Sequence, residues 1–154
     1  MHSVARWTLA VVGLTLAFTA SAAKDPNEKA IKARQAVMTL QSWYAGPLFQ
    51  MAKGDMDYDA GSASVYAMAL HTMVTVKGDM MWPPGTDSDA YPDKSRTLPE
   101  LWSNWPAVGE KGQALLDASA ALAEVAGDGL DALRSKVGAV GQACKGCHDD
   151  FRAD

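Results

Sequence analysis

Residues 128–148 read DGLDALRSKVGAVGQACKGCH, and this stretch predicts the last helix of the fold. Apolar side chains recur along it at steps of three and four residues, a spacing that places them on one face of an α-helix. The members of this stripe are Leu130, Leu133, Val137, Val140, Cys144 and Cys147. We therefore expect an amphipathic helix that begins near Asp128 and turns both cysteines toward the core.

The end of this stretch, Cys144-Lys145-Gly146-Cys147-His148, is typical of a covalent haem attachment site. Each thiol can add across one vinyl group of haem, and the adjacent histidine can ligate the iron. On a helix, the two cysteines lie at i, i+3, and Cys144 and His148 lie at i, i+4, so all three share one face. The motif predicts one haem c, held through two thioethers, with His148 as an iron ligand.

The same cysteines could instead form a zinc half-site, a redox dithiol or a structural disulfide. Zinc would need further ligands, but the chain has two cysteines and three histidines, and only His71 could add a distant ligand to the mature chain. A redox C-x-x-C is expected beside a βαβ pattern, which this sequence lacks. A disulfide across so tight a loop would constrain the unfolded chain little. Haem attachment is therefore the favoured interpretation.

Residues 1–23 have the three parts of a secretory signal peptide. His2 and Arg6 form a short basic start, residues 7–18 are a 12-residue apolar run, and residues 20–22 read Ala-Ser-Ala, a cleavage pattern. A membrane anchor is the alternative, but the run is shorter than the about 20 residues that a span needs. The sequence therefore predicts a cleaved signal over 1–23 and export to a bacterial periplasm.

The mature chain, residues 24–154, is long enough for one domain with its own core. The signal holds one of the 14 basic residues and none of the 18 acidic ones, so the mature chain has a net charge of −5 before the haem propionates are added. This balance argues against a nucleic-acid partner and suits a redox partner with a positive patch. No other segment could cross a bilayer, so we expect no membrane attachment after signal cleavage.

The first helix is predicted from Asp25, a helix N-cap followed by Pro26, to a stop at Gly54. Its apolar stripe includes Ile31, Met38, Ala45 and Ala52. Because proline disrupts a helix interior, Gly46-Pro47 predicts a kink or a break.

The second helix is predicted from Asp59 to about Lys77, with Gly78 as its C-cap. Its inner face is expected to comprise Val65, Met68, Ala69, Thr72, Met73 and Val76. The connection over residues 79–99 holds Gly85 and four prolines, so it is expected to be irregular, and connections of this length are often functional.

The third helix should begin between Pro99 and Asn104 and end at Gly127, with Leu115, Leu116, Ala118, Leu122 and Val125 inside. No strand period and no internal repeat occurs. The predicted fold is all-α: an antiparallel four-helix bundle with a long loop between helices two and three.

The chain resembles the cytochrome c′ family, four-helix-bundle cytochromes whose haem motif lies near the C-terminus. The matching elements span nearly the whole mature chain: Ala33-Arg34-Gln35 with Met38, Tyr58-Asp59-Ala60, Pro84-Gly85-Thr86, Pro99-Glu100-Leu101-Trp102, and residues 144–152. The resemblance implies that Arg34 lies beside a haem propionate, although a surface arginine would fit the pattern too. It places Arg152, at i+4 from His148, near the imidazole, where an ordinary solvated cation is the alternative. Trp82 and Trp102 would pack against haem or core.

The resemblance also places Met38 on the distal side of the iron, facing His148 across the haem. Some family members have an apolar residue there that leaves the iron five-coordinate and open to nitric oxide or carbon monoxide. Others are low-spin and use a methionine as the sixth ligand, which raises the reduction potential and suits electron transfer. A methionine can also simply fill space.

Two functions follow from these alternatives, and neither is enzymatic. The first is a periplasmic c-type cytochrome that transfers single electrons between redox partners. The alternative is a five-coordinate haem protein that binds nitric oxide or carbon monoxide. Because related proteins often pair through helices one and two, a homodimer is also expected, with Tyr44, Phe49, Tyr66 and several methionines supplying apolar surface.

Overall fold

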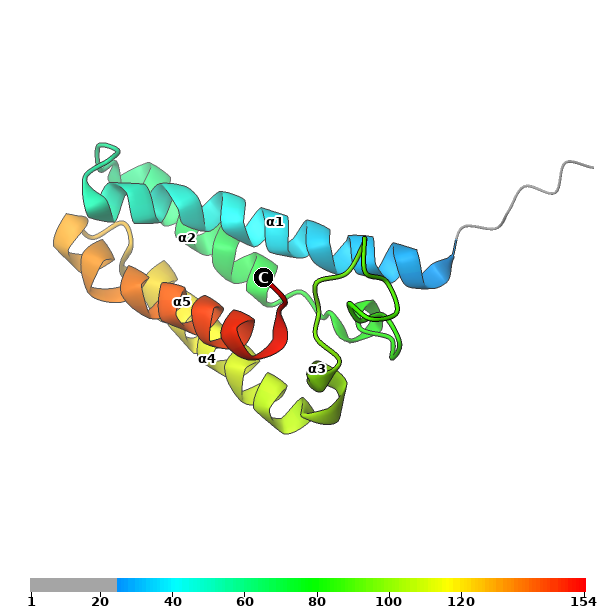
Figure 1. Ribbon diagram of the computed structural model, residues 1–154. Helices are drawn as coiled ribbons and strands as arrows, with labels where there is room; N and C mark the ends of the chain where they lie inside the picture. The colour runs from blue at the N-terminus through cyan, green and yellow to red at the C-terminus, as the bar shows by residue number, and fades with distance from the viewer. Residues whose placement is uncertain (1–24) are drawn as a thin grey trace, which may run out of the picture.

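The computed structural model describes residues 25–154, and these form an all-α bundle (Figure 1). The long helices are α1 (Pro26–Lys53), α2 (Ala60–Val74), α4 (Trp105–Val125) and α5 (Leu130–Phe151); the short ones are the 3-10 helix η1 (Asp79–Met81) and α3 (Glu100–Ser103). The four long helices alternate in direction, so the predicted antiparallel four-helix bundle is confirmed. The predicted signal lies outside the described residues. Within them, no helix is long and apolar enough to span a bilayer.

Helix α1 begins and ends where its sequence predicts. Asp25 is the N-cap, and its side chain accepts a hydrogen bond from the Asn27 backbone N–H at 2.9 Å. Gly54 ends the helix in the left-handed conformation, with φ of 87°, which glycine adopts without strain. A kink or a break was expected at Gly46-Pro47, and the break is wrong, because α1 continues through Pro47. One missing N–H in a helix of 28 residues leaves enough hydrogen bonds on either side to hold it.

Helix α2 differs from its prediction in its C-terminal end and in the face that it buries. It ends at Val74 rather than near Lys77, and Gly78 precedes η1 instead of capping α2. Its buried residues are Ala63, Ala67 and Leu70, at i, i+4 and i+7, while three residues expected inside (Val65, Met68 and Val76) are 65%, 59% and 41% exposed. Small alanines let neighbouring helices approach closely, so the stripe with the smaller side chains faces the core.

The third predicted helix is two helices in the structure. The short α3 ends at Ser103, and α4 begins at Trp105. Along α4 the inward stripe is Ser119 and Leu122, with Ala126 just beyond its end, while Leu115 and Ala118 are half-buried against it. The last helix, α5, buries Leu133, Val137 and Val140 as predicted.

The hydrophobic core occupies one end of the bundle. Its members come from the last turns of α1, the first turns of α2, the end of α4 and the start of α5: Leu48, Met51, Ala63, Ala67, Leu70, Leu122, Ala126, Leu133, Val137 and Val140. These segments meet at the two short inter-helix turns (Figure 1). We call this the closed end. The haem motif of α5 lies toward the opposite end, where the core is sparse.

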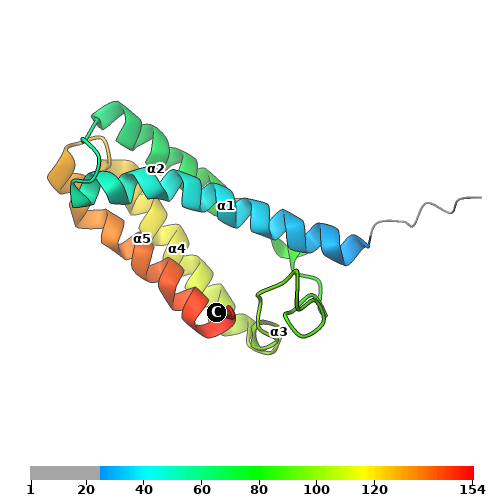
Figure 2. The ribbon, with the colours of Figure 1, turned by 45° about the horizontal axis from the view of Figure 1, so that its top comes forward.

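At that opposite end, α1 and α5 diverge (Figure 2). Residues 79–99, which include η1 and connect α2 to α3, lie across the gap between them. We call this segment the strap. Helix α5 packs mainly against α4, and α1 mainly against α2, so the bundle is two helix pairs that touch at the closed end and open toward the strap.

The corrected face of α2 can be tested by a pair of substitutions. Leu70→Ala should lower the free energy of unfolding by about 2–5 kcal/mol, because Leu70 is 2% exposed and its loss leaves a cavity. Met68→Ala, two residues away and exposed, should cost less than about 0.5 kcal/mol. Denaturant titration of both variants at one protein concentration measures this. Equal losses, or a larger loss for Met68→Ala, would contradict the assignment.

Candidate haem site

A cavity of about 1210 Å³ lies between the diverging helices, bounded by α1, the strap and the last turns of α5. Its walls are mostly apolar, with Trp82, Leu101, Val108 and Phe151 near the strap and Trp43 and Pro47 farther along α1. The polar side chains that reach it include three arginines, Arg34, Arg96 and Arg152. An apolar cleft with positive charge at its edge fits a flat apolar group that carries carboxylates.

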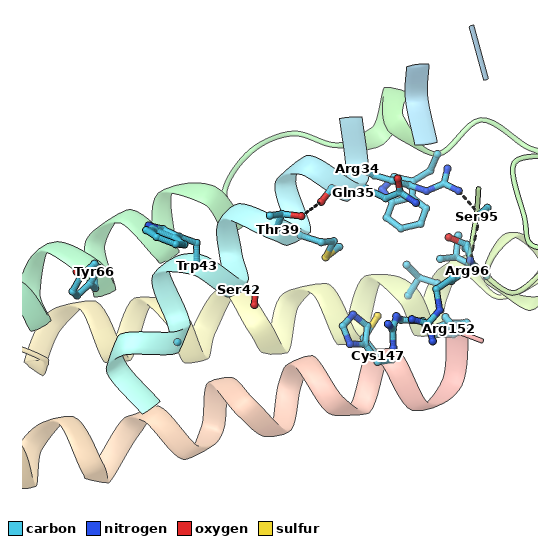
Figure 3. Close-up of a pocket in the computed structure, with 18 of the residues that line it drawn as sticks. Arg34, Gln35, Thr39, Ser42, Trp43, Tyr66, Ser95, Arg96, Cys147 and Arg152 are labelled. Atoms are coloured by element: carbon cyan, nitrogen blue, oxygen red, sulfur yellow. Dashed lines mark hydrogen bonds between the residues drawn. The ribbon is translucent and has the colours of Figure 1, made fainter. Parts of the chain in front are cut away.

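The attachment motif lies along this cavity. Cys147 and His148 line it, while Cys144 is half-buried and packs against the hydrophobic core. Figure 3 shows Cys147 on α5, facing the side of the site where α1 lies. Cys147 and His148 therefore reach the cavity together, whereas Cys144, one turn earlier on α5, does not line it. Both cysteines are free, so the disulfide alternative is not realised in this structure.

Burial changes the pKa of all three side chains of the motif. Burial raises the pKa of the Cys144 thiol. Burial also raises the pKa of Cys147, although the charge of Lys111 partly opposes this. Desolvation, helped by the positive charge of Arg152, lowers the pKa of His148. His148 is therefore held as a neutral imidazole, which is the form that donates an electron pair to iron.

Arg34 is a buried cation at the strap end of the cavity. Its side chain is 4% exposed, and its guanidinium donates to the Met81 carbonyl at 3.1 Å, the Thr86 hydroxyl at 2.8 Å, the Thr86 carbonyl at 2.5 Å and the Ser95 hydroxyl at 2.8 Å. All four acceptors are uncharged, and no carboxylate of the described residues forms an ion pair with it. Burial lowers the pKa of Arg34, although the charge of Asp87 opposes this.

The Nε–H of Arg34 donates to none of the described residues, so one of the five guanidinium donors is free. A buried cation without a contacting anion is costly in a fold, and it favours an anionic group at this place. The carboxylate expected from a haem propionate would satisfy both the charge and the free donor.

The two predicted tryptophans reach the site differently. Trp82 lines the cavity, and the Arg34 guanidinium lies over its ring at 4.8 Å from the centroid. Trp102 supports it from α3, donating its indole N–H to the Trp82 carbonyl at 3.0 Å. Trp82 therefore shields the buried charge and forms part of the wall.

Met38 lies one turn after Arg34 on α1 and lines the cavity, and it is 41% exposed. Among the other exposed methionines, Met56 also lines the cavity, whereas Met68 on α2 and Met80 on η1 do not. Met38 on α1 and His148 on α5 thus contribute a thioether and an imidazole to one cavity from two different helices.

Arg152 follows α5 directly and also lines the cavity. Sequence reasoning missed its neighbour Arg96, a strap residue that also reaches the cavity and lies near Arg152 in Figure 3. It also missed the buried acceptors Thr86 and Ser95. Thr86 was recognised only as part of a loop motif; nothing in the local pattern of Ser95 or Arg96 marks either residue.

The remaining alternatives for the cysteines have no support in the part of the chain that the structure describes. No group of three or more His, Cys, Asp and Glu side chains there could hold a metal ion, which argues against a zinc site. Residues 25–154 form no strand beyond one isolated bridge between Thr97 and Arg152, so no βαβ unit surrounds the cysteines. His71 does not line the cavity; its Nδ1 lies 3.0 Å from the Ser119 hydroxyl, between α2 and α4.

Comparison with known protein families matches most of this chain to one family. The family model described as cytochrome c′ matches residues 29–152, which includes the strap and the whole attachment motif. The chain belongs to the cytochrome c′ family. A cytochrome c′ of Cereibacter sphaeroides is 37% identical over 139 residues, which cover 90% of this chain and 93% of the relative. Proteins of this family carry covalently attached haem c with its iron, so haem c is the cofactor.

Solved cytochromes c′ share the fold as well. That from Rhodobacter Spheriodes has a TM-score of 0.81 at 37% identity, covering 83% of this chain and 98% of its own. A cytochrome c′ with an unusual ligand-controlled dimer dissociation has a TM-score of 0.76 at 30% identity, covering 86% and 100%. The nitric oxide complex of a leucine-to-alanine variant from Alcaligenes xylosoxidans has a TM-score of 0.71 at 33% identity, covering 83% and 96%.

Proposed function

We propose that this cytochrome c′ is a periplasmic one-electron carrier whose haem c is bound through Cys144 and Cys147. Haem bound in this cavity supplies an iron that changes between the ferrous and ferric states. The observation that carries the proposal is that Met38 and His148 line one cavity from α1 and α5. A thioether and an imidazole form the ligand pair that raises the reduction potential and suits electron transfer.

The chain's own residues have separate roles in this proposal. The two thiols would add across the haem vinyl groups and so hold the ring on α5, and His148 would offer its neutral imidazole to the iron. Met38 would offer its thioether sulfur from α1. Arg34 would donate its free Nε–H to a propionate, and Arg152 adds positive charge beside the imidazole.

Gas binding is the second candidate function. The relative from Alcaligenes xylosoxidans forms a nitric oxide complex as a leucine-to-alanine variant. If Met38 only fills space, the present chain would be a five-coordinate haem protein that binds nitric oxide or carbon monoxide. Because His71 lies away from the cavity, neither candidate includes an enzymatic acid–base role.

Covalent attachment can be tested directly. Acid acetone should leave the haem on the polypeptide of the purified holoprotein, because both thioethers survive denaturation. Cys147→Ala should retain at most one thioether and yield a less stable holoprotein. The absorption spectra of the protein pellet and of the solvent measure this, and haem extracted into the solvent from the wild type would refute the attachment.

The role of Met38 is tested by Met38→Ala, with Met68→Ala on the outside of α2 as the matched control. Loss of a thioether ligand should convert the low-spin spectrum almost completely to high spin, lower the reduction potential and open the iron to carbon monoxide. The control should keep the wild-type spectrum and potential. Should the wild type already be high-spin, Met38 is a steric plug, and the gas-binding candidate becomes the better one.

A homodimer through α1 and α2 is part of the proposal, but with a different surface from the one expected. Tyr44, Phe49 and Tyr66 pack against the core, whereas Leu40, Trp43 and Val65 are exposed on α1 and α2. These three supply the unpartnered apolar surface that a two-fold pair of copies would cover.

Sedimentation velocity at micromolar concentration should show a species of twice the chain mass. Val65→Lys should dissociate it, because a charge would be buried in the interface, and Ala139→Lys on the exposed side of α5 should not. A wild-type protein that sediments only at one-chain mass, or two variants that behave alike, would contradict this interface.

A further inference from the structure

The strap is bonded to both of the helices that carry the proposed iron ligands. On the α1 side, the Tyr91 hydroxyl donates to the Asp25 carboxylate at 2.7 Å, and the Gln35 side-chain amide donates to the Lys94 carbonyl at 2.7 Å. Lys94 also forms an ion pair with Glu28. These exposed contacts are individually weak, because solvent competes for each partner.

The buried contact on the α1 side is Arg34. Its four hydrogen bonds reach three separate points of the strap: Met81 at the end of η1, Thr86 in the middle and Ser95 near the far end. Thr86 and Ser95 are fully buried, and Ser95 also donates to the Thr86 carbonyl at 2.8 Å. Figure 3 shows the bond from Arg34 to Ser95 across the top of the site. One guanidinium therefore folds the strap onto α1.

On the α5 side, the strap pairs with the end of the helix through its backbone. The Leu98 N–H donates to the Phe151 carbonyl at 3.0 Å, and the Ala153 N–H donates to the Arg96 carbonyl at 2.8 Å. Thr97 and Arg152 form the isolated bridge between these two bonds. The strap is thus joined to α5 by main-chain hydrogen bonds that do not depend on side-chain identity.

The two attachment points lie one helical turn from the two proposed ligands. Arg34 is four residues before Met38 on α1, and the Phe151–Arg152 pairing is three to four residues after His148 on α5. The helices diverge here and share few direct contacts, so the strap is the connection that limits how far apart they stand. A change in its length or attachment would move the thioether relative to the imidazole.

We infer that Arg34 is a positioning residue: by fastening the strap to α1, it sets the spacing between α1 and α5 and so determines whether Met38 reaches the iron. The inference deepens the proposed ligand pair and rests on it. In this role Arg34 acts through the several N–H donors of its guanidinium. That role is distinct from the attraction between its positive charge and a propionate. Lysine would keep the charge but could not reach four acceptors at three points of the strap.

The first test removes an acceptor without touching the charge. In the holoprotein, Thr86→Val keeps the shape of the buried side chain and leaves Arg34 one partner short, with Ser95→Ala as a second variant. Backbone amides of the strap, such as those of Ser88 and Ser95, which donate to Thr97 and Tyr91, should exchange with deuterium about tenfold faster. Thr72→Val is the matched control, because its exposed hydroxyl only donates to Met68 within α2. Exchange unchanged from wild type in both strap variants would overturn the inference.

The second test uses Arg34→Lys and reads the iron's sixth position. Where the wild type is low-spin, the high-spin fraction should rise in Arg34→Lys and in Thr86→Val, and stay at the wild-type level in Thr72→Val. A strap that exchanges faster while the spectrum stays unchanged would show that it does not position Met38. An Arg34→Lys protein identical to wild type in both readouts would show that only charge matters.

Different results would refute the proposed ligand pair and the positioning role of Arg34. If the wild type is high-spin, Met38 is not a ligand, and the ligand pair of the proposed function is wrong. The rate of carbon monoxide association then reports how Met38 blocks the site, and it should change several-fold in Thr86→Val but not in Thr72→Val. No change in that rate would overturn the positioning role independently of the ligand pair.

Discussion

The divergence of α1 and α5 is the constraint on which the rest of the structure depends. At the closed end, small side chains such as Ala63 and Ala67 let the two helix pairs meet around Leu48, Leu122 and Leu133. Toward the strap a cavity of about 1210 Å³ remains between the helices, with Leu101 and Phe151 among the residues that line it. Burial of apolar surface is the main source of stability for a domain of this size, so we expect bound haem to add to the core.

Electrostatics restricts what can complete that core. Arg34 is buried, makes only uncharged contacts within residues 25–154 and keeps one free donor, while Arg96 and Arg152 reach the same cavity. A purely apolar group would leave this charge without a counter-ion. Haem c combines an apolar ring with two carboxylates, and its iron matches the imidazole of His148. The cavity therefore suits haem c in shape, in charge and in the ligand that it offers to iron.

Local chemistry explains which parts of the structure the sequence predicted. The Asp25 cap and the Gly54 stop follow from backbone hydrogen bonding alone, and the spacing of Cys144, Cys147 and His148 requires one helical face. The inner face of α2 could not be predicted this way, because Val65 and Met68 are more apolar than the alanines that the core contains. Pro47 within α1 is tolerated for a similar reason: the surrounding helix outweighs one local preference.

The strap was the least predictable part of the site. Its prolines indicate an irregular segment, but the partners of Thr86 and Ser95 lie 52 and 61 residues away on α1, and no local pattern encodes such contacts. The family resemblance predicted a role for Arg34 toward the haem, whereas its four hydrogen bonds to the strap came only from the structure. Long-range polar contacts of this kind are the features that sequence periodicity cannot detect.

The absorption spectrum of the oxidised wild-type holoprotein tests the central claim most directly. If Met38 and His148 hold the iron from α1 and α5, the ferric protein should be low-spin and show the weak charge-transfer band of a methionine–iron bond. Carbon monoxide should then change the ferrous spectrum only slowly or not at all. A high-spin ferric spectrum without that band, together with rapid carbon monoxide binding, would contradict the account.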